Sequence, residues 1–172
     1  KHNLLKPADG VPITLPNKEM AVGVFYLTTI DETLRNEKMT TFGNMQEVLL
    51  ANSFGKVRLR EPIQVRVGGE VIETSMGRLI FNERLPKTFG FMNESIKASG
   101  IKKIITRAIG TLSADEVADL IDNIKTLGFY GATISGISVS VFDNEMVEGK
   151  ENLIDLAEEK IKEIEIEYQP GL

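Results

Sequence analysis

Three acidic residues, Asp143, Glu145 and Glu148, lie close together in a polar stretch of the chain. Carboxylate oxygens are the ligands that Mg²⁺ prefers, so a free-standing enzyme with a magnesium ion at this loop is one hypothesis. Acidic residues in front of a helix are more often simply hydrated, because charged side chains rarely leave water without a partner. We therefore interpret these three residues first as a solvated loop.

Other groups that enzymes use for catalysis are scarce. The chain has no cysteine and one histidine, His2. Zinc sites built from cysteine and histidine cannot be assembled from this set, and a serine triad would have to recruit His2. Gly68 and Gly69 lack the following lysine and hydroxyl residue of a phosphate-binding loop. The sequence therefore predicts no catalytic residue and no metal site in this chain.

Arg78 is the most unusual of the basic residues. It lies between Gly77 and the apolar run 79–81. An arginine in such surroundings is usually partnered, because its charge is costly to bury alone. We expect a partner for it, and another subunit is one source of that partner.

The charge balance limits the kind of partner. The net charge is -5, whereas a protein that binds nucleic acid alone carries a basic surplus to contact phosphates. Contact with DNA is therefore expected only through a larger assembly, whose other parts or bound metal supply the positive field.

Composition is typical of a globular protein. The hydrophobic fraction is 42% and the charged fraction 26%, so a core can form. The 172 residues suffice for one medium domain or two small ones. No apolar run reaches the roughly 18 residues that a membrane span needs, and the absence of cysteine fits the reducing cytoplasm. We expect a cytoplasmic protein with no membrane partner.

The pattern predicts an α+β fold with a small antiparallel sheet and short helices, followed by a mainly helical part that ends in a long helix. Its first part, 1–86, is expected to contain a helix over 17–29, a loop over 31–43 and a short helix after Asn44. Alternation from Ile63 to Thr74 around Gly68-Gly69 predicts a β-hairpin. The run 77–81 is expected to be a strand or a buried turn.

The second part, 87–172, is expected to be helical. Apolar spacing predicts a helix over 93–110 and another that begins at a capping box formed by Ser113 and Glu116 and stops at Gly128. The final helix, 149–168, has a heptad seam made of Ile154, Ala157, Ile161, Ile164 and Tyr168.

Two heptads are too short to hold a helix pair by themselves, so this seam needs a partner helix. A stand-alone interaction module that docks a partner on the 149–168 helix is accordingly one hypothesis for the chain. Because the sequence starts at Lys1 rather than Met and stops just after this helix, we also expect it to be a piece of a longer gene product.

Four stretches of the chain, taken in order, carry a resemblance to a known family. They are 3–13 continuing to 20–28, 74–83 with Leu85-Pro86, 127–143 around Ser135-Gly136-Ile137-Ser138, and 150–172 with its ending Tyr-Gln-Pro-Gly-Leu. Together they resemble the largest (beta-prime) subunit of bacterial DNA-directed RNA polymerase, over almost the whole chain. Residues 31–56 fit this pattern poorly.

The resemblance implies a pore-like region over 1–86 and a funnel-like region over 87–172 that ends in the first helix of a rim coiled coil. Such a region borders the secondary channel, where NTPs enter and RNA 3′ ends leave. The implied partners are the other polymerase subunits, NTPs, the RNA 3′ end, transcript-cleavage and regulatory factors at the rim helix, and DNA through the whole enzyme. The catalytic aspartates and their Mg²⁺ belong to other parts of that subunit, so this chain is expected to be inactive alone and without a cofactor.

The resemblance also assigns roles to single residues. Ser135, Ser138 and Asp143 are expected to line the channel, and Arg78 and Asn82 to be structural or interface residues. Factor docking is expected at Asp155, Glu158 and Lys162, the last two forming a possible i,i+4 ion pair. The chain departs from the family pattern at two places. Ile134 stands where family members often carry a basic residue, and Phe142-Asp143 stands where they often carry paired acids.

Overall fold

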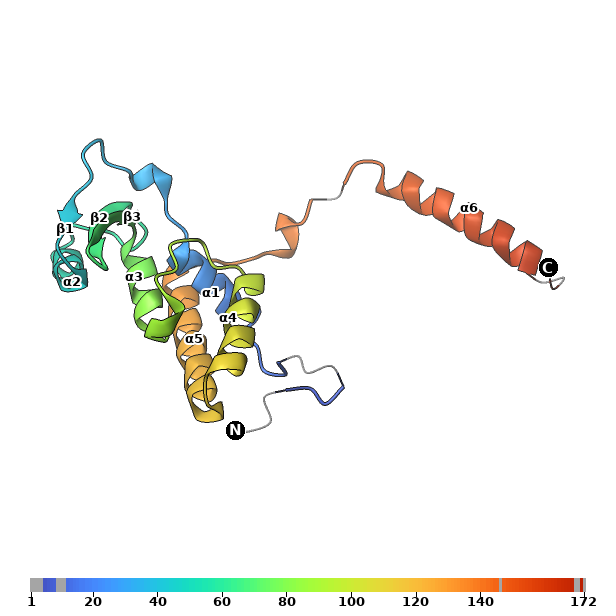
Figure 1. Ribbon diagram of the computed structural model, residues 1–172. Helices are drawn as coiled ribbons and strands as arrows, with labels where there is room; N and C mark the ends of the chain where they lie inside the picture. Colours follow the sequence, from blue (N-terminus) through green and yellow to red (C-terminus); the bar gives the residue numbers. More distant parts are fainter. Residues whose placement is uncertain (1–4, 9–11, 146, 169–170, 172) are drawn as a thin grey trace. The chain divides into compact units, whose positions relative to one another are not determined.

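A computed structural model describes residues 5–8, 12–145, 147–168 and 171, so His2 lies outside the described residues. The chain divides into two compact units, Lys1–Ile137 and Ser138–Leu172 (Figure 1). The predicted boundary at residue 86 falls inside the first unit. The division into a pore-like and a funnel-like region stays a prediction.

Within its described residues, the first unit combines five α-helices with a small sheet. In chain order its main elements are α1 (Glu19–Thr28), β1 (Thr41–Phe42), α2 (Met45–Ser53), β2 (Ile63–Val67), β3 (Glu70–Thr74), α3 (Met76–Glu83), α4 (Ala98–Thr111) and α5 (Ala114–Ser135). Short 3₁₀ turns lie at Glu32–Leu34 and Lys87–Phe89. The expected α+β fold that ends in a long helix is confirmed.

As far as the structure describes the chain, the sheet has three strands in the order β1-β2-β3. β2 and β3 form the expected antiparallel hairpin, in which Val67 pairs with Glu70 around Gly68-Gly69. Both glycines have positive φ, as a two-residue hairpin turn requires. β1 was expected to be loop, but it pairs parallel with β2, Thr41 opposite Gln64.

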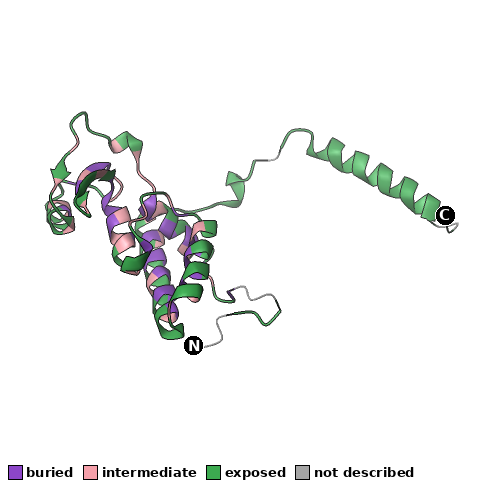
Figure 2. Cartoon of the chain, in the orientation of Figure 1, coloured by how far each residue is buried: buried purple, intermediate pink, exposed green. Residues whose placement is uncertain are grey.

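Two apolar clusters form the core of the first unit. The larger packs α1, α3, α4 and α5 around side chains that include Leu27, Phe81, Ile105 and Ile124. The smaller packs α2 and β2 against the other side of α3, around Val48, Ile63, Val65, Met76 and Leu79. Figure 2 shows the buried residues gathered along these facing surfaces. α3 contributes to both clusters and so ties the sheet to the helices.

The prediction of a strand or turn over residues 77–81 is wrong, because these residues lie in α3. A short apolar run does not distinguish strand from helix by its period alone. Here Ser75 caps a helix by accepting a hydrogen bond from the backbone N–H of Arg78. Gly77 lies so close to α1 that a Cβ atom would approach the carbonyl oxygen of Leu27 to 2.0 Å.

The prediction that Gly128 stops a helix is also wrong. α5 continues to Ser135 and ends at Gly136, whose φ of 61° is left-handed. Gly128 is needed for close packing, because a Cβ atom there would lie 2.6 Å from the carbonyl oxygen of Met20. Gly23 and Gly131 meet at the same crossing of α1 and α5, where a Cβ on Gly131 would lie 2.3 Å from the oxygen of Gly23.

The second unit holds a 3₁₀ turn at Val141–Asp143 and the long helix α6 (Lys150–Tyr168). The expected helix over 149–168 is thus confirmed to within one residue. Every described residue of this unit is exposed, and α6 is exposed on all sides (Figure 2).

Candidate functional site

Arg78 cross-links three segments of the first unit. From its place in α3 its Nε donates to the carbonyl oxygen of Thr28 at 2.8 Å. Its Nη1 donates to the carbonyl oxygen of Asn93 at 2.9 Å and to the Oδ1 of the same residue at 3.1 Å. Partial burial lowers the pKa of Arg78 from its ordinary value, against the opposing effect of nearby glutamates. The partner that the sequence led us to expect is therefore supplied by the chain itself.

Asn82 lies one helical turn after Arg78 and, like Arg78, bonds to the segment around residues 92–93. Its Nδ2 donates to the carbonyl oxygens of Arg78 and of Met92, each at 2.8 Å. Its Oδ1 accepts from the backbone N–H of Met92 at 2.7 Å. The side-chain amide thus satisfies both backbone polar groups of Met92.

Thr28 and Asn93 complete this network, which we call the α3 clamp (Arg78, Asn82, Thr28 and Asn93). The fully buried Thr28 donates from Oγ1 to the carbonyl oxygen of Val24 and accepts from the N–H of Ile96, both at 2.8 Å. The Nδ2 of Asn93 donates to the carbonyl oxygen of Glu73 in β3 at 2.7 Å. Satisfied polar networks of this kind fix one arrangement of the elements they join. The clamp therefore sets how the sheet, α1 and α3 meet.

A second network holds residues 29–36, and its members were not singled out by sequence analysis. Glu61 is buried and accepts hydrogen bonds from the Nδ2 of Asn36 at 2.7 Å and from the N–H of Arg58 at 3.0 Å. Arg60 donates from Nε to the carbonyl oxygen of Thr29 at 3.1 Å and stacks 4.6 Å from the ring centroid of Tyr26. No motif marks these residues, because Asn36 lies 25 residues from Glu61 and Thr29 lies 31 residues from Arg60.

The exposed rim of the sheet carries an ion-pair network centred on Arg35. Its Nε contacts Glu32 at 2.6 Å and its Nη2 contacts Glu73 at 2.7 Å. The hydrogen bond from Arg35 lowers the pKa of Glu32, and the two glutamates raise the pKa of Arg35. Since these side chains are well exposed, the pairs contribute little to stability.

The predicted channel residues are divided between the two units. Ser135 is the last residue of α5, where its Oγ donates to the carbonyl oxygen of Ala132 at 2.7 Å and accepts from the N–H of Ile137 at 3.2 Å. Ser138 and Asp143 belong to the second unit and are exposed. Asp143 accepts from the N–H of Ser140 at 2.6 Å and so closes a local turn.

The carboxylates of the acidic loop do not gather around a common point. Within the part of the chain that the structure describes, no group of three or more histidine, cysteine, aspartate or glutamate side chains is placed to hold a metal ion. The carboxylate of Asp143 is already engaged with Ser140. Nothing in the described geometry therefore supports the hypothesis of a magnesium enzyme at Asp143, Glu145 and Glu148.

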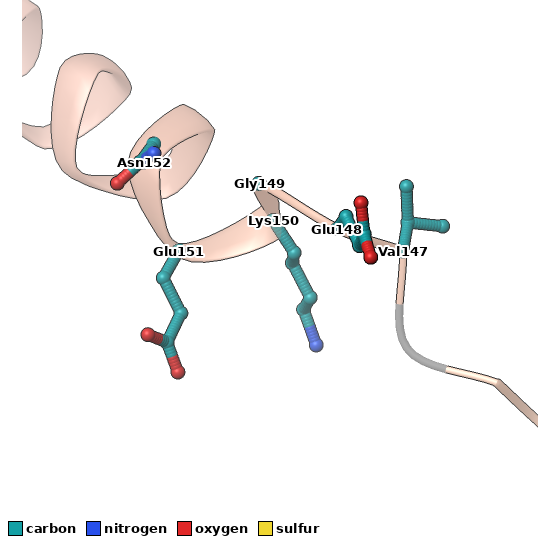
Figure 3. A pocket seen from close by; sticks show the side chains of 6 residues that line it. All are labelled: Val147, Glu148, Gly149, Lys150, Glu151 and Asn152. Atoms are coloured by element: carbon teal, nitrogen blue, oxygen red, sulfur yellow. The ribbon is translucent and has the colours of Figure 1, made fainter.

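Two hollows bear on the predicted site residues. One, of about 360 Å³, is lined by six consecutive residues at the start of α6, Val147 to Asn152. Figure 3 shows that one continuous stretch forms it, with Lys150 and Glu151 projecting to the same side. Another, of about 300 Å³, is mostly apolar and lies beside Asn82, between Val65, Leu79 and Phe91. Neither brings together groups that could perform catalysis.

α6 presents the predicted docking residues Asp155, Glu158 and Lys162, all exposed. The expected ion pair between Glu158 and Lys162 does not form in this structure; among the described residues the ion pairs lie elsewhere. The seam residues 154, 157, 161, 164 and 168 all fall within the helix and are open to solvent.

Comparison with known proteins gives a consistent result. The family model described as RNA polymerase Rpb1, domain 3, matches residues 3–144. The chain is 37% identical over 175 residues to a protein of Thermosipho africanus named DNA-directed RNA polymerase subunit beta′, and 38% identical over 173 residues to that of Salinibacter ruber. The protein of the same name from Aquifex aeolicus is 35% identical over 170 residues. Each match covers 99% of this chain but only 11 to 12% of the relative.

Among the described residues, no helix combines the length and the apolar character needed to cross a membrane.

Proposed function

The chain belongs to the RNA polymerase Rpb1 domain 3 family, and from this premise we propose that it works as one part of the beta′ subunit of a DNA-directed RNA polymerase. The observation that carries the proposal is similarity over 99% of the chain to subunits of that name in several bacteria. The chain spans about 11% of the length of those relatives. RNA synthesis is accordingly a property of the whole enzyme.

Within the subunit, the role of this chain is structural. The α3 clamp directs its polar groups onto backbone atoms of its own chain. The crossing of α1 and α5 is close-packed through three glycines. Both features favour a rigid structural role for this part. Neither directs a reactive group toward solvent.

The finer proposal is that the chain lines the secondary channel of the enzyme. NTPs would enter and RNA 3′ ends would leave past Ser135, Ser138 and Asp143. Small polar side chains suit such a path, because they let charged substrates pass without holding them. The exposure of Ser138 and Asp143 supports this assignment.

The Mg²⁺ that such an enzyme uses does not fit the residues described here. No cluster of three potential ligands forms among them. We therefore derive no step of catalysis through this chain.

A second candidate function is protein docking on α6. The exposed apolar seam of this helix favours it, because a seam of this kind is stable only against a partner. In the whole enzyme this helix would receive transcript-cleavage and regulatory factors. As a stand-alone module the chain would use the same surface.

The proposal is tested by isolating the native gene product. An affinity tag inserted between Gly68 and Gly69 in the chromosomal gene lies in an exposed hairpin turn, away from the core. We expect the other polymerase subunits and DNA-templated RNA synthesis activity to co-purify with the tagged product. Untagged cells are the control. A tagged product recovered without either would overturn the proposal.

A further inference from the structure

The outward side of α4 is positively charged. Residues 87–110 contain five basic residues and one acidic residue, in a chain whose net charge is -5. α4 itself has no aspartate or glutamate. Its apolar residues, among them Ile101, Ile104 and Ile105, face the core, so its basic residues lie on the opposite side. We call the exposed basic residues of this side and of the adjoining turn the α4 basic face (Lys87, Lys102, Lys103 and Arg107).

Arg107 is fixed in place without losing its charge. Its Nη2 donates to the carbonyl oxygen of Thr88 at 3.0 Å, and its Nη1 donates to that of Phe89 at 3.3 Å. Its guanidinium lies 4.4 Å from the centroid of the Phe89 ring. Both acceptors are neutral carbonyls, so the positive charge is not cancelled. The same bonds hold the 3₁₀ turn Lys87–Phe89 against α4 and so bring Lys87 to the edge of the face.

The charges of the face are not balanced within the described part of the chain. Lys103 and Arg107 are four residues apart on one helix, a spacing at which like charges repel and destabilise the helix. Among the described residues, no ion pair includes a member of the face. Glu94, the acid that precedes α4, acts electrostatically on Arg78 instead. A partner that brings carboxylates would relieve this repulsion.

The middle of the face is low and leaves room for a partner. Ser99, Thr106 and Gly110 are small, exposed and on the same side of α4 as Lys103. Nothing lies within 4 Å of a Cβ atom added at Gly110. Small side chains let another backbone come close. Lys103 and Arg107 are about 6 Å apart along the helix axis, which matches acidic residues four apart on a second helix.

Nucleic acid fits this face less well than a protein carboxylate does. Both Nη atoms of Arg107 are already bonded to backbone carbonyls, so its guanidinium does not offer a free fork to a phosphate. Within residues 87–110, all of which the structure describes, no aromatic side chain is exposed for a base to stack on. Phe89 is buried beneath Arg107.

We propose that the α4 basic face docks an acidic helix of another polypeptide, one that carries aspartate or glutamate four residues apart along one side. Lys103 and Arg107 pair with these acids at the centre of the contact, and Lys87 and Lys102 pair at its edges. Exposed pairs of this kind supply selectivity more than affinity, and salt weakens them. The surface belongs to the first unit, so the proposal does not depend on the role of α6 or on the channel assignment.

The test uses the full chain and two alanine-based helical peptides of identical composition. In one peptide the glutamates lie four residues apart along one side; in the other they are spread around the helix. Binding is followed by NMR chemical shifts of the isotope-labelled chain, which report weak binding and locate it. We expect the one-sided peptide to shift α4 amides and to bind at least about fivefold more tightly at low salt. At about 0.5 M NaCl most of this preference should vanish.

Variants of the chain separate the face from its overall charge. K87Q/K102Q/K103Q should weaken binding of the one-sided peptide at least about fivefold. K6Q/K38Q/K56Q, which removes as many charges at exposed lysines outside the face, should leave the binding unchanged. K103E gives Arg107 an acidic neighbour four residues away, so it should keep or raise the Tm while it removes the preference. This last variant shows that a loss of binding is not a loss of folding.

Three results would overturn the proposal. The first is equal binding of the two peptides, or no binding of either. The second is a preference that K87Q/K102Q/K103Q leaves unchanged. The third comes from a single-stranded RNA of about 12 nucleotides: if it binds more tightly than the one-sided peptide and loses that binding in the same variant, the face belongs to nucleic acid. None of these results bears on the polymerase assignment, which the tagged gene product tests by itself.

Discussion

The guanidinium of Arg78 donates to the carbonyl oxygen of Thr28 across 50 residues of sequence, at 2.8 Å. The hydroxyl of Thr28 in turn accepts a hydrogen bond from the backbone N–H of Ile96. One buried threonine therefore bonds both to α3 and to the segment that leads to α4. Few side chains thus determine how the sheet region and the helices of the first unit are held together.

Replacing Arg78 with alanine should lower the free energy of unfolding. The change removes hydrogen bonds from a charged donor and leaves the buried carbonyl of Thr28 without that partner, a loss of about 2 kcal/mol. Urea denaturation of the full chain measures it, and R84A, at an exposed arginine at the end of α3, is the matched control. In the whole polymerase the same variant should slow assembly or elongation. Wild-type stability of R78A would show that the clamp is not what holds these elements.

Replacing Gly128 with alanine should also destabilise the chain, by about 2 kcal/mol, because overpacking forces the backbones of α1 and α5 apart. The new Cβ would lie 2.6 Å from the carbonyl oxygen of Met20. At Gly110 in α4 nothing lies within 4 Å of an added Cβ. G110A should therefore be neutral or stabilising by up to about 1 kcal/mol. Thermal unfolding of the two variants side by side distinguishes them, and equal Tm values would contradict the close crossing.

The capping box of α5 should make stability depend on pH. Hydrogen bonds from the hydroxyl and the backbone N–H of Ser113 lower the pKa of Glu116 below its ordinary value of 4.5. A carboxylate whose pKa is lower in the folded state contributes stability above the unfolded-state pKa, and this contribution is lost as the pH falls through the folded value. Unfolding measured between about pH 3 and pH 7 should show that loss for the wild-type chain.

The variant E116Q should flatten this pH dependence, because glutamine keeps the capping geometry but does not titrate. D119N, on the same helix and also exposed, should leave it intact. An unchanged pH profile in E116Q would show that the cap does not contribute through its charge.

The channel assignment predicts contact between Ser138 and RNA. Since the chain has no cysteine, S138C introduces a single thiol into this region of the polymerase. In a backtracked complex, an RNA with a thiol-reactive group at its 3′ end should cross-link to S138C and not to S99C on the exposed face of α4. Cross-linking to S99C alone would place the channel elsewhere.

Local patterns in the sequence were sufficient to predict the hairpin at Gly68-Gly69, the cap at Ser113 and the extent of α6, because turn, cap and heptad signals act over a few residues. They were not sufficient at Gly128, since a glycine that ends a helix and one that lets another helix approach look alike in the sequence. The contact of Glu61 with Asn36 could not be anticipated either, because it joins residues 25 apart in the sequence and depends on tertiary packing. The role of Arg78 was partly predictable: its need for a partner followed from its apolar neighbours, but the identity of that partner did not.

The mass of the native gene product, and the activity that co-fractionates with it, test most directly whether the chain is part of a polymerase subunit. A lysate of the source cells is first separated by size under native conditions. Each fraction is then denatured and probed with an antibody raised against residues 73–86. We predict a band far above the 19.0 kDa of this chain, in the same fractions as DNA-templated RNA synthesis. A band near 19.0 kDa in fractions without that synthesis would contradict it and would favour a stand-alone docking module.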